Sequence, residues 1–94
     1  MKLEKMCFDP DKDVGNREKH GLSLAEAAHL DWENALVWED TWREYDEARQ
    51  VALAVLGTRV HVVVFVDRVE ERRIISLRKA NVKEVMRYVE ACGD

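Results

Sequence analysis

The sequence predicts an α+β protein with two N-terminal helices, an antiparallel β-sheet and a C-terminal helix. Three patterns predict this fold: capped helical segments over residues 9–31, apolar runs joined by turns over residues 49–77, and helical periodicity after Asn81. The chain has 94 residues, a length typical of one domain, so we expect residues 1–94 to form a single unit.

The first segments predict a short strand followed by a capped helix. Residues 2–8 are short and mixed in character, as edge strands often are. Asp9 is a good N-cap, and Pro10 suits the first helical position, where its missing N–H costs nothing. Gly21 stands where a left-handed C-cap would end the helix. We therefore expect a polar surface helix from Pro10 to His20.

A second helix is expected directly after the first. Ser23 and Glu26 have the spacing of a capping box, and the helix should end near Asp31. Its apolar side would come from Leu24, Ala27, Ala28 and Leu30. Residues 35–38 then predict a short strand, and residues 39–46 a polar loop.

The centre of the chain predicts the sheet. Residues 49–56 and 59–66 form a hairpin pattern, with Gly57 opening a two-residue turn. Residues 62–66 are apolar at every position, which indicates a strand covered on both faces. A third strand over residues 71–77 would complete an antiparallel meander.

The last helix begins at Asn81, an N-cap with Glu84 three residues on. Apolar residues then recur at helical spacing, which predicts one buried face. This face consists of Val82, Val85, Met86 and Val89.

Charge and composition exclude several classes of protein. The net charge is -4, so a domain that coats nucleic acid by charge alone is disfavoured, although a local basic cleft fits the seven basic residues between 68 and 87. The longest apolar run, residues 62–66, is too short to span a bilayer. Cys7 and Cys92 do not make a disulfide framework. We expect a soluble, reduced, cytoplasmic protein.

No metal or cofactor is expected. The three histidines, at positions 20, 29 and 61, have no zinc-ligand spacing, and neither cysteine lies near another ligand in sequence. The four glycines are isolated from one another, so no phosphate loop or dinucleotide motif is present.

Two acid–base candidates stand before the central hairpin. His20 lies at a predicted helix C-terminus, where it either transfers protons or acts as a structural cap. Glu47 and Arg49 share strand parity, so they either face one cleft or form a surface ion pair.

The arginines of the third strand are phosphate-binding candidates. Strict alternation places Arg72, Ser76 and Arg78 on one face and Arg73 on the other. Arginine offers a forked set of donors that suits a phosphate. The alternative is a solvated face paired with nearby glutamates. The tryptophans at positions 32, 38 and 42 are core or partner-contact candidates, and base stacking is a third possibility.

Three ordered blocks of residues resemble the BrnT toxin family. The first block holds Phe8-Asp9-Pro10, Lys12, Asn16, Lys19-His20-Gly21, Ser23-Leu24 and Glu26-Ala27; the second holds Asp46-Glu47, Arg49 and Leu56-Gly57; the third holds Arg73-Ile74-Ile75-Ser76, Arg78-Lys79-Ala80, Glu84 and Tyr88. The chain departs from the family pattern at two positions: Phe8 stands where tryptophan is usual, and Leu77 where alanine is usual.

The resemblance implies a RelE-like ribonuclease fold and a metal-independent endoribonuclease that cleaves RNA and inhibits translation. The partner implied is a BrnA-like ribbon-helix-helix antitoxin, and DNA would be bound only through the toxin–antitoxin complex. Among the arginines, the resemblance favours Arg73 over Arg72.

From these arguments together we assign two sets of candidate residues. The catalytic set is His20, with Glu47 as its substitute, together with Arg49, Arg68, Arg73 and Arg78; the RNA-binding set is Lys19, Ser76 and Lys79. Two other functions stay open: a catalytically weak partner that only binds the antitoxin, which the acidic N-terminal half and the tryptophans favour, and a separate nucleic-acid-binding domain, which the charge disfavours.

Overall fold

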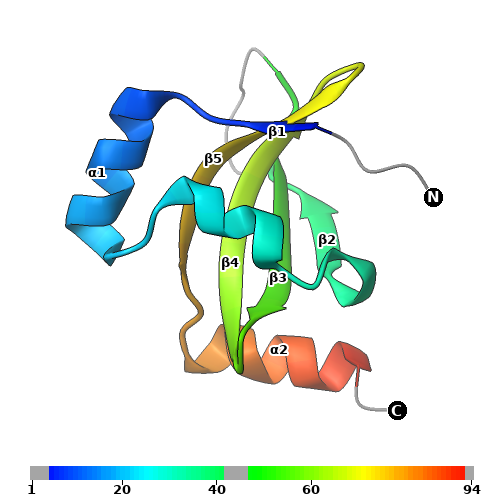
Figure 1. Ribbon diagram of the computed structural model, residues 1–94. Helices are drawn as coiled ribbons and strands as arrows, with labels where there is room; N and C mark the ends of the chain where they lie inside the picture. The colour runs from blue at the N-terminus through cyan, green and yellow to red at the C-terminus, as the bar shows by residue number, and fades with distance from the viewer. Residues whose placement is uncertain (1–4, 42–46, 93–94) are drawn as a thin grey trace.

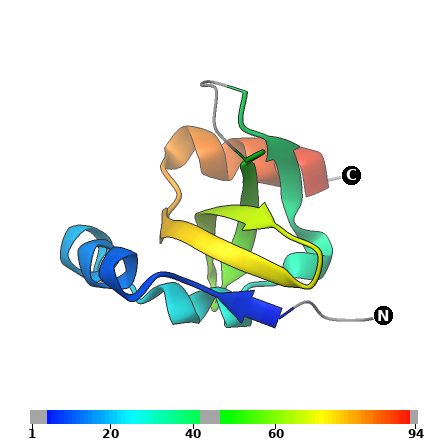
Figure 2. The ribbon, with the colours of Figure 1, turned by 90° about the horizontal axis from the view of Figure 1, so that it is seen from above.

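The computed structural model describes residues 5–41 and 47–92. A five-stranded sheet has the order β1-β5-β4-β3-β2, where the strands are β1 (Lys5–Cys7), β2 (Leu36–Glu39), β3 (Gln50–Leu56), β4 (Arg59–Asp67) and β5 (Glu71–Lys79). The helices are α1 (Pro10–His20), the 3-10 helices η1 (Leu24–His29) and η2 (Trp32–Asn34), and α2 (Val82–Cys92). One face of the sheet lies under η1 and the other packs on α2 (Figures 1 and 2).

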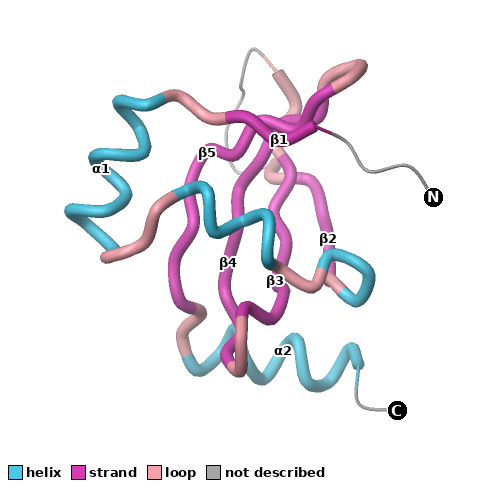
Figure 3. The backbone as a smooth tube through the Cα atoms, in the orientation of Figure 1, coloured by secondary structure: helices cyan, strands magenta, loops and turns pink. Residues whose placement is uncertain are grey.

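The predicted α+β class is confirmed, but the prediction of a wholly antiparallel sheet is wrong. Strands β3, β4 and β5 form the expected antiparallel meander, and β2 adds to β3 in the same sense. Strand β1, however, pairs with β5 in parallel, with Cys7 opposite Arg73. A hairpin forces its two strands to be antiparallel. No hairpin joins β1 to β5 (Figure 3), because strands β2, β3 and β4 lie between them in the sequence.

Helix α1 begins and ends where the sequence predicts. The carboxylate of Asp9 accepts a hydrogen bond from the N–H of Asp11 at 2.8 Å, and Pro10 occupies the first turn. At the other end Gly21 adopts φ 73°, and its N–H donates to the carbonyl of Arg17. Only glycine enters this left-handed region without steric cost, which fixes the end of α1.

The prediction of a second N-terminal α-helix is wrong, because η1 is a 3-10 helix. Ser23 still caps it, accepting from the N–H of Ala25 at 3.1 Å. Its three buried apolar residues, Leu24, Ala27 and Leu30, are spaced by three. A 3-10 helix has three residues per turn, so this spacing places all of them on one line over the sheet.

Two hydrophobic clusters fill the sheet's two faces. The cluster beneath η1 contains buried residues Leu24, Ala27, Leu30, Ala52, Ala54, Val63, Phe65, Ile74 and Leu77, with Phe8 packed against it. The cluster beside α2 contains Leu53, Val60, Val62 and Ala80, with Val85 and Tyr88 packed against it. Strand β4 therefore sends side chains into both clusters, as the unbroken apolar run over residues 62–66 predicts. None of the described helices is long and apolar enough to cross a membrane.

Asn16 joins α1 to the edge of β5. Strand β1 pairs only with residues 71–73, so it leaves the edge of β5 uncovered at Leu77. The buried Asn16 amide takes that place: its oxygen accepts from the N–H of Leu77 at 3.1 Å, and its nitrogen donates to the Leu77 carbonyl at 2.9 Å. The same nitrogen donates to the carbonyl of Leu22 at 2.9 Å. The side chain thus holds α1, the following loop and β5 together.

Helix α2 has the predicted cap but not the predicted buried face. Asn81 and Glu84 exchange side-chain-to-backbone bonds of 2.8 and 2.9 Å, which confirms the capping box. Val82, Met86 and Val89 are 75%, 58% and 55% exposed, so their predicted burial is wrong. The sheet covers only the flank of α2 that carries Val85 and Tyr88.

Replacing Asn16 should destabilise the protein strongly. The Asn16→Ala variant leaves the buried N–H and carbonyl of Leu77 without partners, and each such group costs about 1–3 kcal/mol. We expect urea unfolding to show a loss of about 2–4 kcal/mol. The matched control is Asn34→Ala, which removes one exposed bond to Asp31 and should change stability by less than about 0.5 kcal/mol. Equal effects of the two changes would contradict this role.

Candidate functional site

A β-bulge in β5 decides which side chains share a face. Val64 pairs with Ser76, but the next residue of β4, Phe65, pairs with Ile74. Ile75 is therefore the extra residue of a bulge, at which the alternation of side chains shifts by one.

The strict alternation predicted for β5 is consequently wrong. Ile74 and Leu77, three residues apart, both enter the cluster beneath η1. Arg72 lies on this same face, whereas Ser76 and Arg78 lie on the other. The sequence gives no local sign of the bulge, such as a glycine, at this position.

Three polar side chains of β5 lie on the face that packs on α2, which we call the α2 face. Directly opposed residues of an antiparallel pair point to the same side. The register pairs Arg73 with Val66, Ser76 with Val64, and Arg78 with Val62. Lys79 pairs with His61 and so points to the opposite face from Ser76. Helix α2 crosses only the end of the sheet near the β3–β4 turn, so Ser76 and Arg73 stay partly exposed (Figure 1).

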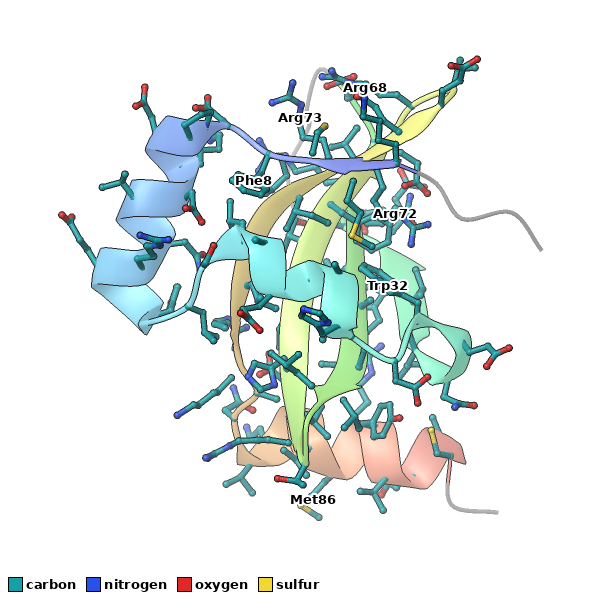
Figure 4. All side chains as sticks on the ribbon, in the orientation of Figure 1. Phe8, Trp32, Arg68, Arg72, Arg73 and Met86 are labelled. Atoms are coloured by element: carbon teal, nitrogen blue, oxygen red, sulfur yellow. The ribbon has the colours of Figure 1, made fainter. Side chains whose placement is uncertain are left out.

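Arg72 is a packing residue. Its guanidinium makes two bonds to the carboxylate of Asp67, at 2.6 and 2.9 Å. The same group lies 4.6 Å from the ring centroid of Trp32 and 4.4 Å from that of Phe65, within cation–π range. Figure 4 shows Arg72 pointing toward Trp32. These contacts remove Arg72 from the set of phosphate-binding candidates.

Arg73 has an unsatisfied donor. Its Nε is buried and has no hydrogen-bond partner in the described part of the chain. Among the described residues, no ion pair to Arg73 is formed either. Buried donors are nearly always paired, so the Nε of Arg73 is an exception that calls for an explanation. Arg73 and Arg68 lie at the same end of the sheet (Figure 4).

Glu47 and Arg68 form a bidentate pair beside Arg73. Arg68 Nε and Nη2 donate to the Glu47 carboxylate at 3.0 and 2.9 Å, and Arg68 Nη1 lies 3.7 Å from Glu71. The hydrogen bonds from Arg68 lower the pKa of Glu47, and the positive charge of Arg73 adds to this effect. The ion pair that Glu47 forms is thus with Arg68, which differs from the predicted pair of Glu47 with Arg49. Arg49 is half-buried directly before β3, and its carbonyl accepts from the N–H of Asp40.

His20 lies at the other end of β5. Partial burial lowers the pKa of His20, and the positive charges of Lys19 and Arg78 lower it further. The imidazole is therefore mainly neutral at pH 7, when it is able to accept a proton.

Arg78 is tied to α2. Its two Nη atoms donate to both oxygens of Glu84 at 2.9 Å, and Nη1 also reaches the carbonyl of Lys79 at 3.3 Å. The alternative that Arg78 pairs with a nearby glutamate is therefore confirmed. This pair connects β5 to the first turn of α2.

The predicted site residues thus divide into two groups. Glu47, Arg68 and Arg73 form one group, and His20, Lys19 and Arg78 form the other. Arg73 and Arg78 pair with Val66 and Val62, which are four positions apart on β4, a separation of about 13 Å at about 3.3 Å per residue. A single phosphate group is too small to contact both groups. Ser76 lies between them on the α2 face.

Two of the three tryptophans belong to the cores. Trp32 packs beneath η1 and donates from Nε1 to the carbonyl of Ala27 at 2.9 Å. Trp38 packs on the α2 face, with the Arg87 guanidinium 4.1 Å from its ring centroid. Trp42 lies outside the described residues.

Histidine, cysteine and carboxylate side chains do not gather into a metal-binding group of three anywhere in residues 5–41 and 47–92. The polar side chains that do gather are arginines with carboxylate neighbours. The guanidinium groups donate in a fork that matches the oxygens of carboxylates and phosphates.

Fold and site together define a small α+β protein with an arginine-bearing sheet face suited to phosphate groups. Residues 8–84 match the family described as the ribonuclease toxin BrnT of type II toxin–antitoxin systems. The chain therefore belongs to the BrnT toxin family. A comparison with curated proteins finds no match. Membership confirms the predicted family, its ribonuclease class and the existence of an antitoxin partner.

The Arg78–Glu84 pair should make stability depend on pH. The hydrogen bonds from Arg78 lower the pKa of Glu84 in the folded protein. The pair therefore stabilises the fold fully above the ordinary glutamate pKa of about 4.3, and less as the pH falls through the lower folded value. Urea unfolding of the parent and Glu84→Gln should differ most at pH 7 and converge below pH 4. A difference that stays constant with pH would contradict the assignment.

Proposed function

We propose that the chain is a metal-independent endoribonuclease that binds RNA on the α2 face and inhibits translation by cleaving it. The observation that carries the proposal is the unpaired, buried Nε of Arg73 beside the Glu47–Arg68 pair. A preorganised donor without a partner stabilises negative charge as it develops, at little reorganisation cost.

The proposed chemistry needs only the RNA and side chains. The ribose 2′-OH attacks the adjacent phosphorus, so a bond forms between the 2′ oxygen and phosphorus while the bond to the 5′ oxygen breaks. A base takes the 2′-OH proton, and the departing 5′ oxygen takes a proton from solvent. The products are a 2′,3′-cyclic phosphate and a 5′-OH end.

In this proposal Arg73 and Arg68 hold the oxygens of the reacting phosphate, with a supporting charge from Arg49, the residue that precedes β3. When Arg68 turns to the phosphate, it releases Glu47, and the pKa of that carboxylate rises toward its ordinary value. Glu47 then acts as the base. The substitute assignment from the sequence thus becomes the first choice, because Glu47 and not His20 lies beside the unpaired arginine.

The second group of residues would bind the same RNA at a neighbouring position. Lys19 and Arg78 supply positive charge there, and His20 is a neutral hydrogen-bonding group at pH 7. Ser76, between the two groups, would contact the backbone. Lys79 points away from this face and would contact RNA only beyond its edge.

The partner that we propose is a BrnA-like ribbon-helix-helix antitoxin, which binds DNA while this chain contacts DNA only through the complex. The family supports the existence of an antitoxin. The acidic balance of the whole chain supports a protein that does not bind DNA by itself.

Replacing Arg73 tests the phosphate clamp. Arg73→Ala should lower the rate of RNA cleavage on the order of 100-fold, because one preorganised donor set is lost. The cleavage rate of Arg73→Lys should lie between those of the parent and Arg73→Ala, since lysine keeps the charge but not the forked set of donors. The control is Arg59→Ala, an exposed arginine at the β3–β4 turn, which should cleave at the parent rate. Parent-like cleavage by a folded Arg73→Ala protein would exclude the clamp.

The base is tested by two isosteric changes and a pH profile. Glu47→Gln should reduce the cleavage rate on the order of 100-fold. His20→Gln should mainly raise the RNA concentration at which cleavage reaches half its maximal rate. With Glu47 as base, the rate of the parent should vary little between pH 6 and 8. A rate that rises with a midpoint below 6.5, the ordinary histidine pKa, and that is lost in His20→Gln, would instead assign the base to His20.

A second candidate function is an antitoxin-binding partner with little catalysis. The two bidentate pairs favour it, because glutamates occupy the forks of Arg68 and Arg78 in the structure. Growth after expression of the chain alone separates the two functions: a ribonuclease toxin arrests growth, and a binding partner does not.

A further inference from the structure

Helix α2 carries an exposed apolar stripe, Val82, Met86 and Val89, which we call the α2 ridge. These side chains are 75%, 58% and 55% exposed. Met86 points away from the sheet (Figure 4). Their spacing of four and then three residues aligns them along one side of the helix. An aligned apolar stripe of this kind is characteristic of a surface that packs against another helix.

One flank of the α2 ridge carries opposite charges at its two ends. Lys83 and Glu90 are seven residues apart, so they lie on the same flank, one near each end of the helix. Within the described residues neither of them forms an ion pair. The other flank carries Val85 and Tyr88, which pack against the protein's own sheet.

We infer that two copies of the chain pair through their α2 ridges, antiparallel, about a two-fold axis near Met86. The axis places Met86 against Met86 of the second copy and Val82 against Val89 of the second copy. It also brings the same flank of both helices together in reverse order. Lys83 then meets Glu90 of the second copy, and the symmetry repeats this pair.

The charge pattern selects this orientation over a parallel one. Parallel helices would oppose unlike flanks, so Lys83 and Glu90 would face the flank that already packs on the sheet. Antiparallel pairing gives two favourable charge pairs, each between Lys83 of one copy and Glu90 of the other. The α2 ridge is therefore complementary to itself.

The dimer should be weak, because α2 has only 11 residues and the contact is smaller than a standard interface. Sedimentation equilibrium of the purified chain should give a mass that rises with concentration from 11.0 kDa toward twice that value. Met86→Lys should give the monomer mass throughout. The control Val69→Lys alters a valine that is 96% exposed on a turn, and should dimerise like the parent.

Charge exchange tests the orientation. By symmetry, Lys83→Glu changes both pairs at once and should weaken dimerisation on the order of tenfold; Glu90→Lys should do the same. The double exchange should restore parental association. Both single changes suit the helix dipole, with the acid near the N-terminus and the base near the C-terminus, so a weaker dimer would not reflect a weaker helix.

Three outcomes would overturn the inference: a parent that stays monomeric up to millimolar concentration, a Met86→Lys protein that still dimerises, or a double exchange that does not restore association. The first outcome together with antitoxin binding that Met86→Lys abolishes would assign the ridge to the antitoxin. None of these measurements depends on RNA cleavage, so the proposed ribonuclease function succeeds or fails separately.

Discussion

The geometry of the α2 face depends on which group forms hydrogen bonds with the backbone at the uncovered edge of β5. Beyond the reach of β1, this edge presents a buried N–H and carbonyl, and leaving either unpaired would cost about 1–3 kcal/mol. The planar amide of Asn16 offers a donor and an acceptor in one group, as a neighbouring strand would. A helix is thereby attached to a strand edge. The C-terminus of α1, with His20, consequently lies beside β5 and not in solvent.

The bulge at Ile75 has an equally large effect on the site. Without it, Arg73 would share a face with Leu77 and point beneath η1, while Arg72 would share a face with Ser76 and Arg78. The bulge shifts the alternation by one residue. Arg72 then enters the aromatic surroundings of Trp32 and Phe65, and Arg73 joins Ser76 on the α2 face. Two adjacent arginines of equal chemistry thus take different roles.

Features that depend on local chemistry could be predicted from the sequence, and those that depend on distant contacts could not. The caps of α1 and α2 and the turn at Gly57 each rest on a few neighbouring residues, and all three form as predicted. The parallel pairing of β1 depends on segments far apart in the chain. The 3-10 form of η1 lies between these cases, because the three-residue spacing is visible in the sequence but resembles an α-helical pattern. The faces on which Arg72 and Arg73 lie could not be predicted, because they depend on the bulge in the register of β4 and β5.

Helix α2 shows how far a periodic pattern can be interpreted. An apolar stripe predicts that some surface covers it, but not that the protein's own sheet covers all of it. On α2 the stripe is wider than the area in contact with the sheet, so Val85 and Tyr88 pack inward and Val82, Met86 and Val89 remain exposed. The Arg78–Glu84 pair joins the first turn of α2 to β5 and so favours the orientation in which the rest of the stripe stays exposed. The same interaction that connects α2 to the site therefore leaves the ridge available to a second molecule.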